Sequence, residues 1–270
     1  MFIFLPHITV PKYFIGRLDR FLREQFKNLP QSLLEKSIRK KLILVNQKKE
    51  KSNHQVSDGN VITYPPSFEA FKAVSEKSKD LHLYQKFLKL VVYENEEFCV
   101  INKPYNIATQ GGINVKYSIN DMANASDKTY FLVHRLDKKT TGLLILAKNK
   151  LAANTLMHQF KNKEIQKYYV ALTDKKPHPA SGVTDLPLHD VPAKTRYRYI
   201  GKTENYHAIL LKPYTGRKHQ IRLHLAAIKI PIVGDDIYHG AHADRMYLHA
   251  YKLKIPYNNK SLTIKYNPQF

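Results

Sequence analysis

The latter two-thirds of the chain consists mainly of short strand-like segments separated by turns. From residue 88 onward these segments read LKLVVYE, EFCVINK, FLVHRLD, GLLILAK, KYYVALT, TRYRYIG, HAILLKP, YLHAYKLKI and SLTIKY. Short runs rich in β-branched and aromatic residues predict β-strands. Two stretches with helical spacing interrupt them, NKLAANTLMHQFKN and RKHQIRLHLAAIK. Many strands with few helices predict an α+β domain over residues 87–270, built on a mixed, mainly antiparallel sheet.

Residues 14–64 form a separate small unit in the sequence. An apolar stripe with spacings of three and four residues predicts a first helix in GRLDRFLREQFKNL. Ser32 followed by Glu35 is a capping-box pattern, so we expect a second helix to begin there. LILVN and the segment after the Asp58–Gly59 turn predict short strands. Residues 65–86 are rich in proline, serine and lysine without a clear period, and we interpret them as a linker with room for a short helix.

The chain carries a large positive charge, with 44 Lys and Arg against 22 Asp and Glu, a formal net charge of +22. Such a surplus attracts polyanions, and nucleic acid is the first candidate because its phosphates dominate binding. The small unit shares this bias, with twelve basic against five acidic residues between positions 12 and 64. A generally basic proteome or a solubility adaptation would produce the same surplus, so charge alone does not decide the partner.

The sequence argues against several other classes of protein. The single cysteine, Cys99, lies in an apolar segment and cannot form an internal disulfide, which fits a reducing compartment. No apolar run approaches the ~18 residues of a membrane helix, and the N-terminus lacks the basic region of a signal peptide. The histidine pairs do not follow zinc-site spacing, and the sequence has no nucleotide-binding glycine motif or serine elbow. We therefore expect a cytoplasmic protein without a membrane anchor or a metal.

One acidic side chain stands in a strongly basic segment, HRLDKKTTG at residues 134–142. Asp137 is flanked by His134, Arg135, Lys138 and Lys139. Cations near a carboxylate favour its ionised form, which is the form that a nucleophile or a general base needs. A turn aspartate paired with a surface cation would produce the same local pattern. The segment by itself leaves both interpretations open.

A second basic segment, YTGRKHQIRLHLAAIK, follows at residues 214–229. Thr215–Gly216 could begin a helix whose free backbone N–H groups suit a phosphate. Arg217, Lys218, His219 and Arg222 add further donors, and the last two share a helix face because they are three residues apart. An amphipathic helix with a basic outer face explains the same spacing without any ligand.

Together these segments resemble the RluA family of pseudouridine synthases. The resemblance rests on HRLDKKTTGLLILAK, IQKYYVALT, TGRKHQIRLHLAAIKIPIVGDDIYHG and YLHAYKLKI, and it covers residues 88–256. RLDRFLREQF followed by LILVN is similar to the S4 RNA-binding domain that many members of this family carry. The usual turn of that module reads Asn46–Gln47 here instead of containing a glycine.

The resemblance implies an enzyme that isomerises uridine in RNA to pseudouridine without cofactor or metal. The motifs place the catalytic aspartate at Asp137 and its partner at Arg222. They place a tyrosine that stacks near the base and serves as a candidate proton relay at Tyr169. Arg135 matches the arginine that fills the gap left by the extruded base, which offsets part of the unstacking energy. An S4-bearing member most resembles the branch that acts on large-subunit (23S) ribosomal RNA, and we expect a monomer.

Beyond the three catalytic positions, we expect a set of basic side chains to contact the RNA. They are His134, Arg135, Arg217, Lys218 and His219 in the large domain, and Arg17, Arg20, Arg39, Lys40 and Lys41 in the S4-like unit.

Two other functions use much of the same sequence. A noncatalytic RNA-binding or ribosome-assembly protein would keep the basic surface, but it would not need Asp137, Tyr169 and Arg222 together. An N-glycosylase would also use a carboxylate near the sugar carbon, and such enzymes generally need a second carboxylate. The pair Asp235–Asp236 is a weak candidate for that role, since it is more typical of a turn.

Overall fold

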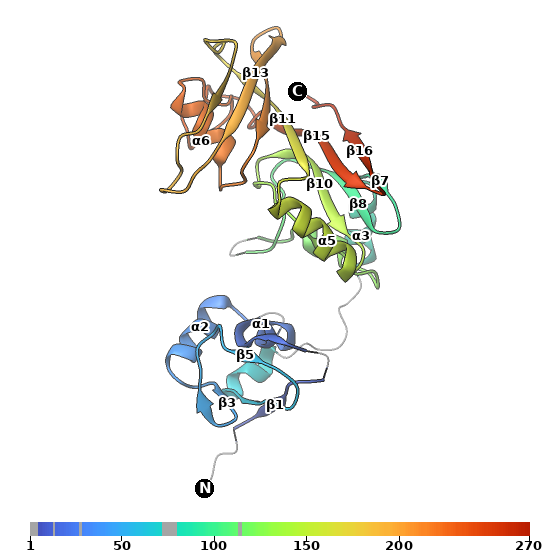
Figure 1. Ribbon diagram of the computed structural model, residues 1–270, viewed down its shortest axis with the longest axis vertical. Helices are drawn as coiled ribbons and strands as arrows, with labels where there is room; N and C mark the ends of the chain where they lie inside the picture. Colours follow the sequence, from blue (N-terminus) through green and yellow to red (C-terminus); the bar gives the residue numbers. More distant parts are fainter. Residues whose placement is uncertain (1–4, 13, 27–28, 72–79, 113–114) are drawn as a thin grey trace. The chain divides into compact units, whose positions relative to one another are not determined.

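The computed structural model describes residues 5–12, 14–26, 29–71, 80–112 and 115–270. The chain forms two compact units, residues 1–78 and residues 79–270 (Figure 1). Among the described residues, the N-terminal unit has one hydrophobic core and the C-terminal unit has two.

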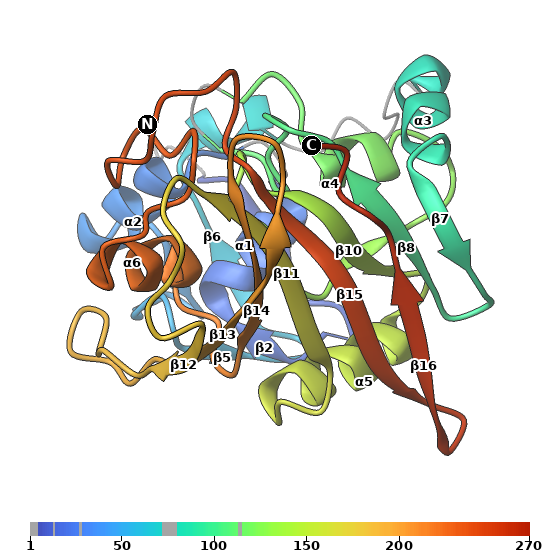
Figure 2. The ribbon, with the colours of Figure 1, turned by 90° about the horizontal axis from the view of Figure 1, so that it is seen from above.

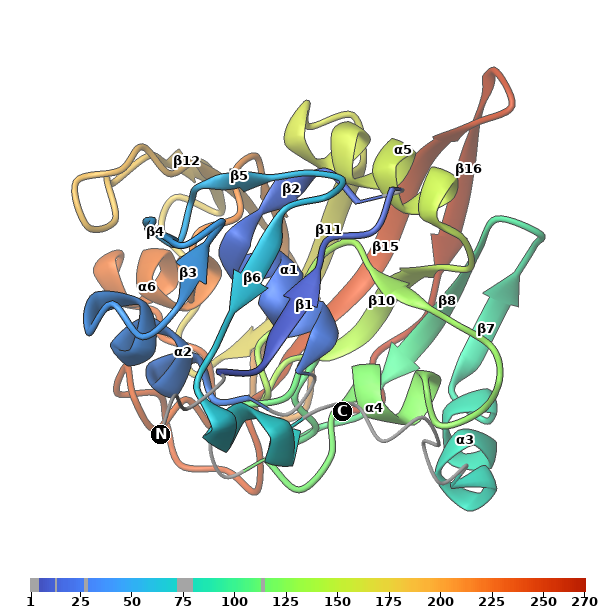
Figure 3. The ribbon, with the colours of Figure 1, turned by 90° about the horizontal axis from the view of Figure 1, so that it is seen from below.

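The N-terminal unit packs two helices on a small antiparallel sheet. The helices are α1 (Leu18–Gln25) and α2 (Gln31–Arg39). The sheet order is β1-β6-β3-β4, and its strands are β1 (His7–Thr9), β6 (Val61–Thr63), β3 (Leu44–Val45) and β4 (Lys48–Lys49). A separate pair joins β2 (Gly16–Arg17) to β5 (Gln55–Val56). Figure 3 shows β1, β6 and β3 with α1 behind them. Phe21, Leu34 and Ile62 from these elements are completely buried in one core.

The second helix begins differently from the expected capping box. Its N-cap is Pro30, with no side-chain hydrogen bond, and the helix starts at Gln31. Gln31 Nε2 donates to Glu35 Oε1 at 3.0 Å, so Glu35 is bonded to the side chain one turn before it instead of to Ser32. The prediction of a helix was right and its cap was wrong, since Pro30 takes the N-cap position in an extended conformation and has no side-chain oxygen to accept from the first N–H groups.

The glycine-free turn of this unit has the geometry of a tight hairpin. Asn46 and Gln47 both have positive φ, 47° and 64°, and they connect β3 to β4. Two successive residues with positive φ are the signature of a type I′ turn. Asn46 also accepts a hydrogen bond from Val61 N through its side chain at 2.8 Å, which helps hold a conformation that glycine adopts more readily.

Parts of the expected linker belong to the two cores. The 3₁₀ helix η1 (Pro66–Phe71) buries Phe68 in the N-terminal core, and α3 (Leu81–Leu88) buries Tyr84 and Phe87 in the C-terminal core. The remainder of that segment, residues 72–79, lies outside the described residues.

The C-terminal unit is built on a ten-stranded mixed sheet. The main order is β12-β13-β14-β11-β15-β10-β8-β7, while β16 pairs with β15 and β9 pairs with β10 (Figure 2). The strands are β7 (Val91–Glu94), β8 (Phe98–Lys103), β9 (Phe131–Leu132), β10 (Thr141–Ala147), β11 (Gln166–Thr173), β12 (Ser181–Thr184), β13 (Thr195–Lys202), β14 (His207–Pro213), β15 (Leu248–Tyr257) and β16 (Lys260–Lys265). Within the described residues only β10 and β15 pair in parallel, which confirms the expectation of a mainly antiparallel sheet.

Helices cover this sheet, and its central strand is buried on both faces. Besides α3, the helices are α4 (Ile119–Ala123), α5 (Lys150–Lys161) and α6 (Gln220–Ala227). Along β10, Leu144 and Leu146 belong to one core, while Leu143 and Ile145 belong to the other. Side chains alternate between the faces of a strand, so this split places a hydrophobic layer on each side of β10.

The structure departs from the predicted elements in both units. In the N-terminal unit, β1 and β2 were not predicted, and β1 lies before the expected start at residue 14. β12 and α4 were not predicted. The segment FLVHRLD contributes only the two residues of β9, and HRLD lies in the loop that follows. No helix within the described residues is long and apolar enough to cross a membrane.

Gly142 fixes the start of β10 just after that loop. It has φ of 105° and lies opposite Ala250 of β15 in the parallel pair. A Cβ atom at this position would lie 2.4 Å from the carbonyl oxygen of Ala250. Any other residue would therefore push β15 away and would strain the backbone, since positive φ favours glycine.

Candidate active site

The loop that holds Asp137 is fixed on both sides through its backbone. Thr109 Oγ1 donates to the carbonyl of Leu136 at 2.8 Å and lies 3.2 Å from the N–H of the same residue. Lys103 Nζ donates to the carbonyl of Lys138 at 3.1 Å. The N–H of Thr140 donates to the carbonyl of Asp137 itself at 3.0 Å, which closes the turn. The backbone of Asp137 is thus held by buried side chains from outside the motif.

Lys103 is the most unusual of these supports, because it is a completely buried lysine at the end of β8. Its ammonium also donates to the carbonyls of Pro104 and Ile107, at 2.9 and 2.8 Å. Burial lowers the pKa of Lys103 to about 7, against the opposing effect of the nearby Asp137 carboxylate. Lys103 was not among the residues predicted from the sequence, where it appears as a lysine at the end of an apolar segment, directly before a proline.

The Asp137 carboxylate is open to solvent on one side and faces cationic or polar groups on the other. Its side chain is 33% exposed. Arg222 Nη1 and His219 Nε2 each lie 4.0 Å from Asp137 Oδ2. These distances are too long for hydrogen bonds, and donors in catalytic sites often tighten only when substrate binds. The carboxylate is therefore accessible to a ligand.

The first partner of Arg222 is Asp235 and not Asp137 as the sequence analysis expected. Arg222 Nε and Nη2 donate to the two carboxylate oxygens of Asp235, both at 2.7 Å, and the side chains are 3% and 0% exposed. Asp235 Oδ1 also accepts from the N–H groups of Ile237 and Tyr238. A fully buried carboxylate needs this many donors. Asp137 lies near only the remaining nitrogen of the guanidinium, Nη1, at 4.0 Å.

These contacts weaken the N-glycosylase alternative. Asp235 is buried and fully bonded, so it is not available as a second reacting carboxylate. Asp236 forms an exposed ion pair with Lys139, with Nζ 2.7 Å from each carboxylate oxygen. The pair joins the Asp137 loop to the turn at residues 234–238.

Tyr169 lies on β11 in the C-terminal core, with its side chain almost completely buried. Burial raises its pKa, and the Asp137 carboxylate raises it further, so the phenol stays protonated and lies within electrostatic reach of Asp137. Arg135 is exposed beside Asp137 in the same loop. The structure thus brings Asp137, Tyr169 and Arg222 to one place.

His219 and Tyr238 join the same cluster. His219 Nδ1 lies 2.9 Å from Tyr238 Oη, and the guanidinium of Arg222 lies over the Tyr238 ring at 4.9 Å from its centre. From the sequence, His219 was predicted only as an RNA contact, and Tyr238 was not predicted as a site residue.

The predicted RNA contacts of the large unit have different surroundings. Arg217 and Lys218 are exposed, and Arg217 Nε donates to the carbonyl of Pro192 at 3.3 Å. His134 bonds within the fold: its Nε2 accepts from the N–H of Ile145 at 2.9 Å. Burial, with a smaller effect of Lys167, lowers the pKa of His134 to about 3. His134 is therefore a neutral side chain whose Nε2 is bonded to β10, and its contact with RNA stays a prediction.

The expected phosphate-binding helix start at Thr215–Gly216 is also wrong. Helix α6 begins at Gln220, with His219 as its N-cap. Gln220 Oε1 accepts from Thr215 Oγ1 at 2.6 Å and from the N–H of Arg217 at 3.0 Å. The residues before the helix form a turn that is held by Gln220, because a buried amide there satisfies the local donors.

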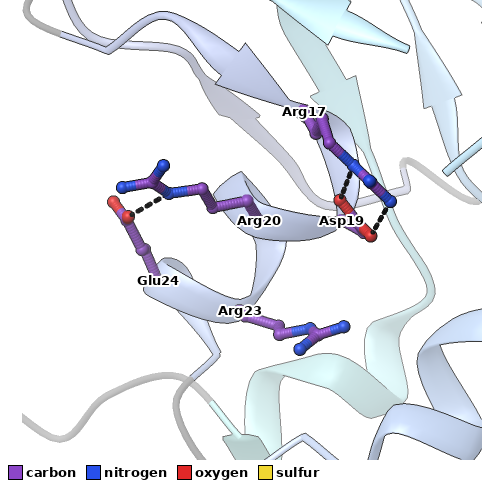
Figure 4. A pocket seen from close by; sticks show the side chains of 5 residues that line it. All are labelled: Arg17, Asp19, Arg20, Arg23 and Glu24. Carbon is purple, nitrogen blue, oxygen red and sulfur yellow. Dashed lines mark hydrogen bonds and ion pairs between the residues drawn. The ribbon is translucent and has the colours of Figure 1, made fainter. Parts of the chain in front are cut away.

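The basic residues predicted in the N-terminal unit line two surface pockets. Figure 4 shows the first, of about 440 Å³, where Arg17 donates to both oxygens of Asp19 and Arg20 pairs with Glu24. The second, of about 610 Å³, includes Arg39 and Lys41. Lys40 is exposed beside them. Arg17 and Arg20 are thus partly neutralised.

No group of three or more histidine, cysteine, aspartate or glutamate side chains that could hold a metal ion occurs in the described part of the chain.

Comparison with known proteins identifies the family. A family model described as RNA pseudouridylate synthase matches residues 97–227. Ribosomal large subunit pseudouridine synthase C of Vibrio vulnificus (strain CMCP6) is 31% identical over 264 residues, which cover 88% of this chain and 84% of that protein. The protein of the same name from Rickettsia bellii (strain RML369-C) is 33% identical over 272 residues and covers 90% of both chains.

The fold agrees with these sequence relationships. The solved structure of human RNA pseudouridylate synthase domain containing 4 superposes with a TM-score of 0.60 at 24% identity, over 70% of this chain and 92% of that one. This superposition confirms the fold with its mixed, mostly antiparallel sheet, and the sequence relatives confirm the resemblance seen in the motifs. The chain belongs to the RNA pseudouridylate synthase family and is RluA-like.

Proposed function

We propose that this protein isomerises uridine to pseudouridine in large-subunit (23S) ribosomal RNA, with Asp137 as the catalytic carboxylate. The observation that carries the proposal is the setting of Asp137, whose backbone is held by Thr109 and Lys103 while its carboxylate remains a third exposed. The choice of RNA rests on the relatives from Vibrio and Rickettsia, which are named for the large ribosomal subunit.

The reaction needs no oxidant, reductant or cofactor. The bond between ribose C1′ and uracil N1 breaks, the base rotates, and a bond from C1′ to C5 forms. The proton on C5 leaves, and N1 gains one, so the atoms of the nucleoside are conserved. An ionised Asp137 serves this chemistry either by attack on C1′ or by removal of the proton from C2′.

The neighbours of Asp137 take distinct parts in this proposal. Arg222 supplies positive charge 4.0 Å from the carboxylate and is itself held by Asp235. Burial, and to a smaller extent the Asp137 carboxylate, raise the pKa of Tyr169, so the phenol keeps its proton close to Asp137, which suits a residue that contacts the base and relays a proton. Arg135 projects from the same loop and is exposed, as a residue that replaces an extruded base must be.

The N-terminal unit is proposed to be an S4-like RNA-binding domain over residues 14–64. Its two helices, its short strands and the basic pocket that includes Arg39 and Lys41 support this role. None of the proposed catalytic residues lies in it. We propose that the protein acts on RNA as a monomer in the cytoplasm.

The test uses ribosomal RNA transcribed with tritium at C5 of uridine. Isomerisation releases this tritium into water, and nucleoside chromatography then separates pseudouridine from free uracil. Asp137→Asn keeps the shape of the side chain but removes its charge, and it should abolish tritium release while RNA affinity persists. Asp244→Asn is the matched control, because Asp244 is an exposed carboxylate bonded to Tyr247 outside the cluster.

Each alternative has a separate outcome. Free uracil without pseudouridine would indicate an N-glycosylase. RNA binding without any change to the RNA would indicate a noncatalytic protein. Full turnover in Asp137→Asn would move the chemistry to another residue.

A further inference from the structure

We propose that His219 is a positioning residue for the Asp137 carboxylate, and that Tyr238 selects the tautomer in which His219 Nε2 carries the proton facing that carboxylate. The inference rests on the proposed catalytic role of Asp137. It assigns His219 to the chemistry through Asp137 and not to the binding of RNA phosphates.

The geometry gives the two oxygens of Asp137 different surroundings. The closest approach of His219 is from Nε2 to Oδ2, and the closest approach of Arg222 is from Nη1 to the same Oδ2, both at 4.0 Å. A carboxylate that is anchored at one oxygen presents the other in a fixed direction. Small movements on RNA binding would bring both donors within hydrogen-bond range of Oδ2, which would hold that oxygen and leave Oδ1 for the substrate.

The tautomer of His219 follows from its two neighbours. An ionised carboxylate has no proton to donate, so a lone pair on Nε2 would face another lone pair and be repelled. With the proton on Nε2, the lone pair lies on Nδ1, which accepts from the hydroxyl of Tyr238 at 2.9 Å. In a neutral imidazole the hydrogen bond made by one nitrogen sets the protonation of the other.

The electrostatic environment agrees with a neutral ring and a protonated phenol. Burial has the largest effect and lowers the pKa of His219. Asp137 and Asp235 raise this pKa, whereas Arg222 and Lys218 lower it. Burial also raises the pKa of Tyr238, against the effect of Arg222.

Both partners are held in place by the fold. His219 is the N-cap of α6 in a left-handed conformation, with φ of 54°, and its carbonyl accepts from the N–H of Leu223 at 2.9 Å. A non-glycine residue in this conformation persists only where its surroundings determine it, and such residues concentrate at functional sites. The N–H of Tyr238 donates to Asp235, and its ring lies under Arg222. The pair is thus anchored to the same salt bridge that positions Arg222.

The experiment measures single-turnover tritium release at saturating RNA and, separately, the Kd for the RNA. The variants are His219→Ala, His219→Gln, Tyr238→Phe and the double variant His219→Ala with Tyr238→Phe. Tyr238→Phe keeps the ring under Arg222 and removes only the hydroxyl. Tyr247→Phe is the matched control, since the hydroxyl of Tyr247 bonds the exposed Asp244. Circular dichroism and thermal midpoints establish that each variant is folded.

We expect His219→Ala to slow single turnover about 10- to 100-fold and to leave the Kd for RNA unchanged. The magnitude is that found when a residue that orients another functional side chain is removed, as in the second shell of metal sites. His219→Gln should recover part of the rate, because its amide N–H reaches toward Oδ2. Tyr238→Phe should slow the native enzyme but have no further effect in the His219→Ala background, since it acts through His219. Tyr247→Phe should leave the rate unchanged.

Four results would overturn the inference. A weaker Kd with an unchanged rate in His219→Ala would make His219 an RNA contact. Additive losses in the double variant would mean that Tyr238 acts independently of His219. A full rate in His219→Ala while Asp137→Asn is inactive would refute the positioning role and leave the proposed function intact, whereas turnover in Asp137→Asn would refute both.

Discussion

Asp235→Asn should destabilise the C-terminal unit far more than Asp137→Asn does. The two substitutions are chemically identical and remove a carboxylate from opposite sides of Arg222. Asp235 is fully buried and makes two hydrogen bonds of 2.7 Å with the guanidinium. Asp137 is a third exposed and lies 4.0 Å away. The contrast therefore tests which carboxylate is the structural partner of Arg222.

The expected losses in the free energy of unfolding differ severalfold between the two variants. Removing one partner of a buried ion pair costs about 3–5 kcal/mol, because the other charge is left without compensation. Asn keeps an oxygen for the N–H groups of Ile237 and Tyr238, and Asp137 takes up part of the pairing, so the loss at Asp235 should lie near ~3 kcal/mol. A partly exposed ion pair contributes only about 0–1 kcal/mol. Asp137→Asn should therefore cost less than ~1 kcal/mol.

Hydrogen-exchange mass spectrometry measures these losses in the C-terminal unit alone, through peptides from the central strands β10 and β15. A loss of ~3 kcal/mol corresponds to exchange about 150-fold faster for the most protected amides. The same peptides should exchange less than about fivefold faster in Asp137→Asn. Equal effects, or a larger effect at Asp137, would refute the assignment of Asp235 as the first partner.

Three further predictions concern other parts of the chain. Burial lowers the pKa of His249 to about 4. Protonation therefore opposes folding as the pH falls from about 6.5 toward 4, and the free energy of unfolding decreases by up to ~3 kcal/mol. Urea midpoints at pH 4.5 and 7.5 should differ less in His249→Gln than in the native protein. Thr109→Val should lower the free energy of unfolding by about 1–3 kcal/mol, because the backbone of Leu136 loses its hydrogen bonds to the buried Thr109 hydroxyl. Turnover should slow without weaker RNA binding. An unchanged rate would mean that the loop is held without this hydroxyl. A fragment of residues 79–270 contains both C-terminal cores and should fold. Filter binding should show that its affinity for ribosomal RNA depends less steeply on salt than that of the full chain, and tritium release should show turnover on a short RNA. An equally steep salt dependence would place the phosphate contacts in the catalytic unit.

Local patterns in the sequence were sufficient for most of the fold. Short runs rich in β-branched and aromatic residues, bounded by turns, located nearly all strands of the C-terminal unit, because such side chains pack well on a sheet. β12 escaped this signal because its residues, Ser181–Thr184, include only one large apolar side chain, and it is exposed. α4 was missed because five residues are too few to show helical spacing.

The sequence also placed the candidate catalytic residues, through motifs and not through periodicity. Asp137 alone was compatible with an ordinary surface pair, and only its combination with the segments around Tyr169 and Arg222 distinguished a site. The structure brings these three residues together from a loop, a strand and a helix. Their roles in the reaction remain proposals that the variants above will test.

What only the tertiary structure decided is how those residues are supported. Sequence spacing suggested that Arg222 pairs with Asp137, but Asp235 occupies the guanidinium because the turn at Gly234 carries its carboxylate into the core. Lys103 holds the Asp137 loop from 34 residues earlier in the chain, through the backbone carbonyl of Lys138. Backbone carbonyls leave no mark in a sequence, and contacts between distant segments depend on the order of strands in the sheet. For this reason the sequence by itself determined which residues are the candidate catalytic residues, while the fold determined which neighbouring groups hold them in place.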